Sequence, residues 1–256
     1  MSILQAIILS ILQGLTEFLP VSSSGHLVLF QKIFGINDPP IFFDTMVHGA
    51  TLVAVIFYLR KDLINILFNL KKNTNLIICL IIGTLPAVFF GLFFKDIIEK
   101  TFNSLPMLSL CFFITAVILY ITKFFKEDGR DMEQINWKDS LVIGMFQASA
   151  ILPSISRSGT TIASGIFQGL SRKTALKFSF LLSIPVILGA LVLQISDIGV
   201  VSSNEITSSL IGFFPALILG FLSLKFLDKY VVNKKFSLFA YYCLFLAVVS
   251  LVISFI

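Results

Sequence analysis

Six long apolar runs set the limits on what this chain can fold into. Each approaches the roughly 20 residues that an α-helix needs to cross a hydrocarbon core of about 30 Å. Only 13% of the residues are charged and 57% are hydrophobic, which excludes an ordinary soluble domain. We therefore predict an all-α integral membrane protein with one polytopic domain over residues 1–256. Its six transmembrane helices are expected at Ile41–Leu59, Leu76–Phe94, Leu105–Thr122, Phe178–Ile195, Leu210–Leu227 and Phe236–Ile256.

Two polar breaks interrupt the apolar sequence, one in each half of the chain. The first is Gln13–His26 and the second is Gln147–Thr161, and both contain Gln, Pro, Ser and Gly in the same order. Most of the apolar runs beside them are too short to cross a bilayer. We predict two re-entrant helical hairpins, because irregular backbone at membrane depth is tolerated only where protein or water surrounds it. The flanking runs are Ile3–Leu19, His26–Ile36, Leu141–Leu152 and Thr161–Leu170.

The hydrophilic segment Lys123–Asp139 divides the chain into two similar halves. Residues 1–122 and 140–256 would each hold one hairpin and three spans. Because three is odd, the second half would enter from the opposite face, as in an inverted-topology repeat with its site between the halves. Most of the 19 Lys and Arg residues then share the face of this segment. The positive-inside rule predicts that this segment is cytoplasmic and that both termini lie outside, so the net charge of +5 requires no nucleic-acid partner.

The first break carries ionisable groups at membrane depth. Gln13 and Glu17 are four residues apart and would share one face of a helix. An ionisable residue inside a membrane segment indicates a functional site, whereas serine and glycine there could also serve helix packing. The returning helix would present an N-terminus that attracts anions. The other candidates in this break are Ser22, Ser23, Ser24, Gly25 and His26.

The second break places one guanidinium among hydroxyl groups. Arg157 could bind phosphate oxygens through two parallel N–H donors, or it could be a structural partner of Glu17. An arginine and two helix N-termini favour an anion, whereas a carboxylate, an amide and an imidazole favour a divalent metal and proton transfer. Together they predict a phosphate-ester or anhydride site that uses Mg²⁺ or Ca²⁺. The candidates here are Ser156, Arg157, Ser158, Gly159, Thr160 and Thr161.

Two further polar residues stand near the start of the first predicted span. Asp44 and His48 are four residues apart, so they would lie on one face of that helix. The sequence leaves open whether they reach the site or lie at the outer interface.

Both breaks closely resemble those of the undecaprenyl-diphosphate phosphatase family, also called bacitracin resistance proteins. The matching stretches are Gly14–His26, which reads GLTEFLPVSSSGH, and Ser156–Thr161, which reads SRSGTT. The resemblance implies a hydrolase of the bacterial cell membrane whose site opens to the outer face. It would convert undecaprenyl (C55 polyprenyl) diphosphate to the monophosphate and phosphate. That reaction recycles the lipid carrier for cell-wall synthesis and confers bacitracin resistance.

The resemblance also implies roles for individual residues. Glu17 would be a metal ligand or an acid–base group, with Gln13 as a second ligand. Ser23 would be the nucleophile, with a water molecule as the alternative. His26 would transfer a proton or contact phosphate. The diphosphate would be held by Ser156, Arg157 and Thr161.

Two positions depart from the usual pattern of that family. Gln13 stands where glutamate is more common, so Glu17 is the one strong carboxylate ligand. Ser154 follows Pro153 where glycine is usual, which affects the geometry expected for the second break.

The main alternative is transport. A lipid-phosphate flippase or an anion carrier would also use inverted repeats with broken helices. Glu17, Ser23 and His26 favour hydrolysis, because a carrier needs anion donors but no nucleophile with a base. In either case the polyprenyl diphosphate lipid would reach the site from the bilayer, and the sequence leaves open whether the chain forms a homodimer.

Overall fold

The computed structural model describes residues 1–36, 40–102, 104–125, 129–232 and 236–255. Within these residues the chain forms twelve α-helices and two short 3-10 helices, and it has no β-strand beyond a single bridge between Arg130 and Leu170. The all-helical prediction is therefore confirmed. The α-helices are α1 (Ile3–Thr16), α2 (Ser23–Ile33), α3 (Ile41–Tyr58), α4 (Arg60–Phe68), α5 (Leu70–Phe93), α6 (Lys95–Phe102), α7 (Leu105–Ile121), α8 (Trp137–Ser149), α9 (Arg157–Phe167), α10 (Arg172–Ile195), α11 (Ser203–Val232) and α12 (Leu238–Ile253).

Five helices are long and apolar enough to cross a membrane, namely α3, α5, α7, α10 and α11. They coincide with five of the six predicted spans, so the chain is a multi-pass integral membrane protein. The sixth predicted run, Phe236–Ile256, contains α12, which is apolar but only 16 residues long. Some helices begin before their predicted spans because hydropathy marks only the apolar part. Helix α10, for example, begins with the polar turn at Arg172 rather than at Phe178.

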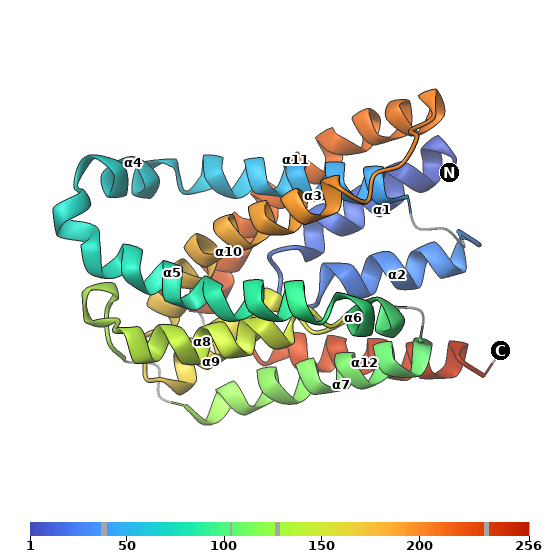
Figure 1. The fold of residues 1–256 in the computed structure, drawn as a ribbon. Coiled ribbons are helices and arrows are strands. Elements are labelled where there is room, and N and C mark those ends of the chain that lie inside the picture. The colour runs from blue at the N-terminus through green and yellow to red at the C-terminus, as the bar shows by residue number, and fades with distance from the viewer. Residues whose placement is uncertain (37–39, 103, 126–128, 233–235, 256) are drawn as a thin grey trace.

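Each polar break ends one short helix and begins another, as predicted. The first break lies between α1 and α2, and the second between α8 and α9 (Figure 1). A serine caps each returning helix, since Ser22 Oγ accepts from the Gly25 N–H at 3.3 Å and Ser156 Oγ from the Gly159 N–H at 3.1 Å. These caps satisfy backbone donors that a helix start leaves unpaired.

Two serines in the breaks adopt the left-handed backbone conformation. The φ angle is 66° at Ser22 and 68° at Ser154. Residues with a Cβ atom adopt this conformation at a cost of about 1–2 kcal/mol, which a glycine at the place of Ser154 would avoid. A threonine of α7 holds that turn: Thr115 Oγ1 donates to the Ser154 carbonyl at 3.0 Å and accepts from the Ser156 N–H at 3.2 Å.

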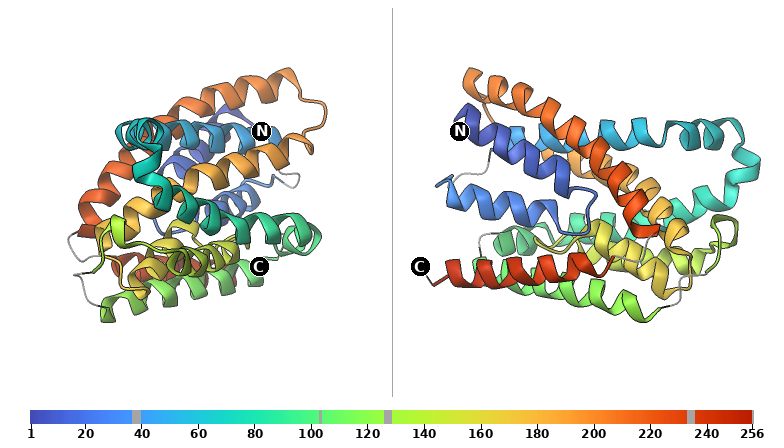
Figure 2. Two further views of the ribbon diagram at one scale, coloured as in Figure 1. Left: turned by 60° about the vertical axis from the view of Figure 1, so that its left-hand side comes forward. Right: turned by 180° about the vertical axis from the view of Figure 1, so that it is seen from behind.

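The first helix of each hairpin packs closely on a helix of the other half. Helix α1 lies on α11 and α8 lies on α5, while α7 and α12 run side by side (Figures 1 and 2). The small residues allow the backbones to approach. A Cβ atom on Gly14 would lie 2.8 Å from the Ala216 carbonyl oxygen, and one on Gly144 would lie 2.7 Å from that of Gly83.

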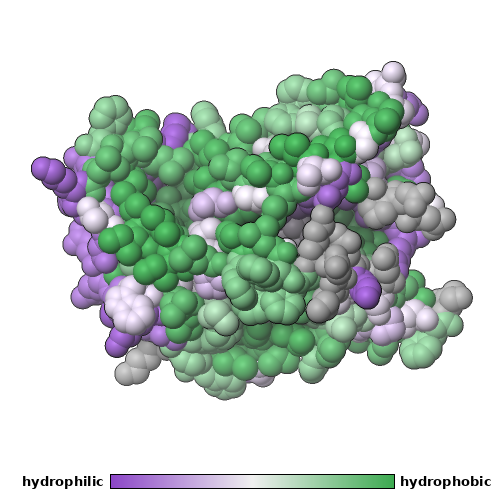
Figure 3. All heavy atoms as spheres, viewed as in Figure 1, coloured by the Kyte–Doolittle hydropathy of each residue, from purple (hydrophilic) through white to green (hydrophobic). Residues whose placement is uncertain are grey.

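The two chain ends lie at the same end of the molecule, and α4 lies at the opposite end (Figures 1 and 2). Hydrophobic residues cover most of the face between them, whereas hydrophilic residues gather around the α4 end (Figure 3). Near that end Lys177 Nζ pairs with the Asp62 carboxylate of α4 at 2.6 Å. The distribution is that of a bundle whose long direction runs through a bilayer.

Candidate active site

A buried carboxylate lies where the two breaks meet. Glu17 follows α1 directly, and its side chain is 7% exposed. Its Oε1 atom accepts a hydrogen bond from Arg157 Nη2 at 2.7 Å, and its Oε2 atom accepts one from Ser23 Oγ at 2.6 Å. The fold therefore brings together three of the four predicted catalytic residues. It also forms the ion pair between Glu17 and Arg157 that the sequence offered as a structural alternative.

Arg157 keeps one of its terminal nitrogens unused. Its Nη1 atom is buried and has no hydrogen-bond partner among the residues that the structure describes. The guanidinium carbon lies 6.0 Å from the ring centroid of Phe18, which is fully buried and packs edge-on against Phe180. A buried donor without an acceptor costs about 1–3 kcal/mol. The free N–H is suited to a bound anion. Arg157 can therefore donate to an anion while it stays paired with Glu17.

The serines of the two breaks are arranged alike. The Oγ atoms of Ser22 and Ser24 lie 3.3 Å apart, and those of Ser156 and Ser158 also lie 3.3 Å apart. Ser158 Oγ donates to the Leu19 carbonyl at 3.0 Å, which joins the second hairpin to the first. Two capped helix N-termini are thus held beside the pair of Glu17 and Arg157, and such termini attract anions.

The side chains of the two predicted threonines, Thr160 and Thr161, form hydrogen bonds with other protein atoms. Thr160 Oγ1 donates to the Ser156 carbonyl at 2.9 Å. Thr161 Oγ1 lies 2.7 Å from Ser179 Oγ on α10, where the two hydroxyls share a hydrogen bond. The sequence reasoning did not single out Ser179, because it is one of two serines, with Ser183, inside an apolar run. Through these hydrogen bonds both threonines stabilise the start of α9.

The two predicted glycines are sites of close packing. A Cβ atom on Gly25 would lie 2.5 Å from Cζ of Phe112 and 2.6 Å from Oγ of Ser154. One on Gly159 would lie 3.0 Å from Cβ of Ser156. Any side chain at Gly25 would therefore push the two breaks and α7 apart.

His26 lies apart from the carboxylate. The residue is 1% exposed. Its Nδ1 atom contacts the Ser22 carbonyl at 2.6 Å, and its Nε2 atom contacts the Tyr242 hydroxyl at 2.8 Å. No hydrogen bond joins it to Glu17 or Ser23 within the described part of the chain. The structure thus places the fourth predicted catalytic residue against α12, and the sequence reasoning missed Tyr242.

His48 lies next to Glu17, and Asp44 contacts His48 from the preceding turn of α3. His48 Nε2 lies 4.0 Å from Glu17 Oε2, and His48 Nδ1 contacts the Asp44 carbonyl at 2.7 Å. The Asp44 carboxylate accepts from Gln31 Nε2 at 3.1 and 3.2 Å. Of the two positions that the sequence left open, His48 is the one whose side chain faces the Glu17 carboxylate.

The donor set fits a partial metal site. Gln13 is fully buried and donates from Nε2 to Glu17 Oε2 at 2.9 Å, while its Oε1 atom has no partner among the described residues. The side chains of Gln13, Glu17 and Ser23 therefore lie together, with the Gln13 amide nitrogen toward the carboxylate. No cluster of three His, Cys, Asp or Glu side chains suited to a metal occurs in the described ranges. Mg²⁺ commonly completes such a set with water and substrate phosphate.

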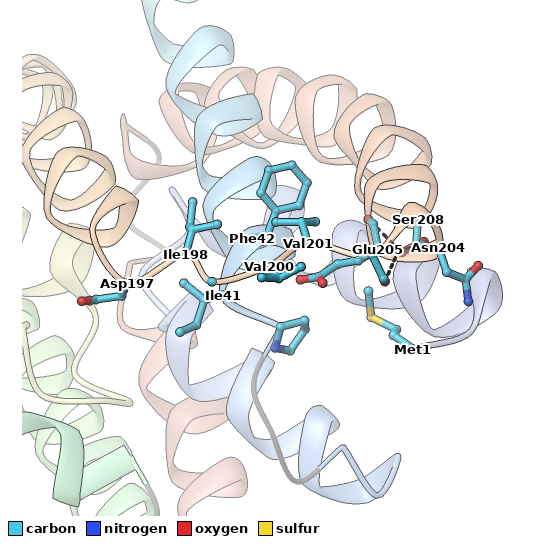
Figure 4. A pocket seen from close by; sticks show the side chains of 13 residues that line it. Met1, Ile41, Phe42, Asp197, Ile198, Val200, Val201, Asn204, Glu205 and Ser208 are labelled. Atoms are coloured by element: carbon cyan, nitrogen blue, oxygen red, sulfur yellow. Dashed lines mark hydrogen bonds between the residues drawn. The ribbon is translucent and has the colours of Figure 1, made fainter.

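A separate cavity of about 340 Å³ lies at the end of the molecule that holds the termini. Met1, Ile41 and Glu205 are among the residues that line it, and Asn204 and Ser208 project from α11 beside Met1 (Figure 4). None of the predicted site residues borders it. The cavity is therefore distinct from the cluster around Glu17.

Comparison with known proteins decides the family. The model of the family described as "Bacitracin resistance protein BacA" matches residues 6–249. The chain belongs to this family. The region that matches the bacitracin resistance protein family includes both breaks, Glu17, Arg157 and also Tyr242.

Curated relatives match over nearly their whole length. An "Undecaprenyl-diphosphatase 4" of Bacillus thuringiensis subsp. konkukian is 40% identical, and the alignment covers 100% of this chain and 98% of that protein. An "Undecaprenyl-diphosphatase" of Carboxydothermus hydrogenoformans is 41% identical over 99% and 98%. Another, from Thermosipho africanus, is 43% identical over 95% and 97%. The alignments thus span nearly the whole length of these relatives in the bacitracin resistance protein family.

Proposed function

We propose that the chain hydrolyses undecaprenyl diphosphate to undecaprenyl phosphate and inorganic phosphate. Such an enzyme recycles the lipid carrier of cell-wall synthesis and confers resistance to bacitracin. Family membership supports this activity, and one observation at the site carries it: the Glu17 carboxylate binds both the Ser23 hydroxyl and the Arg157 guanidinium. Phosphate release by the purified protein in detergent tests it.

In this proposal Ser23 is the nucleophile and Glu17 is its base. Because Ser23 Oγ donates to Glu17 Oε2 at 2.6 Å, the carboxylate can accept the hydroxyl proton as the oxygen attacks the terminal phosphorus. The bond from phosphorus to the bridging oxygen breaks, and undecaprenyl phosphate leaves with the electron pair. Glu17 then passes the serine proton to the departing lipid phosphate. Water attacks the phosphoserine, and Glu17 takes up a proton from that water. The bond from phosphorus to Ser23 Oγ breaks, and Glu17 returns the proton to Oγ as inorganic phosphate leaves. If water attacks directly, the same carboxylate would accept its proton.

Arg157 and the two helix starts balance the charge on the substrate. A diphosphate carries several negative charges, and transfer of its terminal phosphoryl group loads more charge onto the leaving oxygen. The free Nη1 of Arg157 and the N–H groups at the starts of α2 and α9 are donors fixed in place before substrate binds. Removing one such electrostatic group typically lowers the rate by about 10²- to 10³-fold.

A divalent ion, Mg²⁺ or Ca²⁺, is proposed to bind at Gln13 and Glu17. When bound, such an ion would neutralise charge on the diphosphate oxygens. Gln13 has a buried Oε1 atom without a partner among the described residues, and its amide contacts Glu17 through Nε2; these two observations support the assignment.

Gln13→Glu should therefore keep activity and lower the Mg²⁺ or Ca²⁺ concentration needed for the half-maximal rate, because ligand charge tunes the affinity of oxygen sites. The ion should also raise the melting temperature of this variant more than that of the wild type. Gln147→Glu is the matched control, since Gln147 is also buried with an unpartnered Oε1 atom but bonds to the Gly83 carbonyl of α5. Destabilisation of both variants without a change in metal requirement would remove Gln13 from the metal site.

The proposed topology is six transmembrane helices with two re-entrant hairpins, arranged as an inverted repeat of residues 1–122 and 140–256. The reciprocal packing of α1 on α11 and of α8 on α5 supports this arrangement. So does a shared pattern, Ile-Gly-x-x-Pro-Ala, at residues 82–87 of α5 and 211–216 of α11. The site would open to the outer face, and the prenyl chain would enter from the bilayer between helices.

The same proposal places the segment from Lys123 to Asp139 in the cytoplasm and both termini outside. In a background without native cysteines, an impermeant thiol reagent applied to intact cells should label Ser254→Cys and spare Asp131→Cys. Permeabilised cells should show labelling at both positions, which controls for reactivity. The reverse pattern in intact cells would contradict the orientation.

A further inference from the structure

Both ring nitrogens of His26 are committed to hydrogen bonds. The Ser22 carbonyl can only accept, so the proton of a neutral ring is on Nδ1, 2.6 Å away. Nε2 then accepts from the Tyr242 hydroxyl at 2.8 Å. In this arrangement the neutral ring has no nitrogen free to take a proton from Ser23.

The second hairpin contains a counterpart to this contact. His26 stands four residues after the serine that caps α2, and Thr160 stands four residues after the serine that caps α9. Thr160 Oγ1 donates to the Ser156 carbonyl at 2.9 Å, as His26 Nδ1 donates to that of Ser22. A threonine hydroxyl is no general base near neutral pH, so the shared contact indicates a shared structural task. That task is to hold the turn before the helix.

Aromatic side chains fix the His26 ring from two other helices. The ring stacks on Tyr242 of α12 with centroids 5.7 Å apart and an interplanar angle of 11°. Phe112 of α7 meets it edge-on at 6.0 Å and 89°. The first hairpin is therefore fastened through His26 to the pair formed by α7 and α12.

We infer that Tyr242 is a positioning residue for the reaction. Through the His26 ring it holds the left-handed turn at Ser22, and that turn sets the position of the next residue, Ser23, on the Glu17 carboxylate. His26 is then the link between Tyr242 and the turn, and it does not itself take a proton from Ser23. The inference deepens the proposed function and rests on it.

Tyr242→Phe removes the hydroxyl and keeps the stacked ring. We expect kcat for phosphate release to fall about threefold to tenfold, the effect of one lost hydrogen bond, with KM unchanged. Tyr241→Phe is the matched control, because Tyr241 is the neighbouring residue of α12 and its ring packs on Tyr120 instead. Equal kcat values in the wild type and both variants would overturn the inference.

His26→Asn and His26→Ala separate positioning from base catalysis. The asparagine amide can donate to the Ser22 carbonyl from nearly the place of Nδ1, but it cannot act as a base. We expect His26→Asn to keep at least about a tenth of the wild-type kcat and His26→Ala to lose about tenfold more than His26→Asn. If His26→Asn folds with the wild-type melting temperature and is as inactive as His26→Ala, His26 is a base and the inference is wrong.

Nitrogen-15 NMR of histidine-labelled protein tests the same contact without turnover. The His26 signals, identified by their loss in His26→Asn, should show the proton on Nδ1, and Tyr242→Phe should shift the Nε2 signal. A proton on Nε2, or no shift in Tyr242→Phe, would contradict the inference. Absence of phosphate release from the wild type would instead overturn the proposed function and leave this spectroscopic result standing.

Discussion

Replacing Glu17 with glutamine should lower kcat for phosphate release by about 10³-fold, within the range of about 10²- to 10⁴-fold that a positioned acid–base group contributes. The amide cannot accept the Ser23 proton, and it leaves the buried Arg157 without its carboxylate partner at 2.7 Å. The measurement is steady-state release of phosphate from undecaprenyl diphosphate in detergent, beside a thermal melt.

Glu133→Gln is the control for this substitution, because Glu133 lies exposed in the segment between α7 and α8. It should behave as the wild type. If Glu17→Gln keeps more than a tenth of the wild-type rate with an unchanged melting temperature, the carboxylate is not the base.

Arg157→Lys should lower kcat/KM by about 10²- to 10³-fold, with losses in both turnover and substrate affinity. A lysine ammonium is a single point of charge, and it cannot contact Glu17 Oε1 while presenting a second fixed N–H to phosphate. Arg157→Ala should be at least as impaired. The kinetics are measured over a range of substrate concentrations, so that kcat and KM are separated.

Arg60→Lys is the corresponding control, since Arg60 is exposed and its guanidinium contacts the Phe57 carbonyl and ring at the far end of the bundle. It should leave both constants unchanged. Near-normal kcat and KM in Arg157→Lys would contradict a role of the arginine in binding phosphate.

The hairpins and most of the spans could be predicted because they follow from local sequence. In both breaks a proline stands among several polar residues, and a helix ends there. Pro86, Pro185 and Pro215 stand in longer apolar runs and lie inside helices. Helices α4 and α6 were not predicted, because they are short and polar and leave little trace in hydropathy. Charge alone also indicated that Glu17 and Arg157 could meet, and they do.

The contacts between distant helices could not be predicted in the same way. His26 and Tyr242 are 216 positions apart, and no periodicity links a histidine in a polar break to a tyrosine in an apolar span. Likewise, the hydrogen bond between Thr161 and Ser179 depends on how α9 packs on α10. The sequence indicated which residues are unusual, whereas packing decided which of them face the carboxylate and which support the turns.

The most direct test of the account is phosphate release by the purified wild-type protein from undecaprenyl diphosphate, compared with Glu17→Gln and Ser23→Ala. We expect the wild type to convert all of the substrate with one phosphate released per lipid. Both variants should be nearly inactive while remaining folded and inserted in the membrane. The account would be contradicted if the wild type released no more phosphate than the variants. Movement of the lipid phosphate across liposome membranes by the same protein would then favour a transporter.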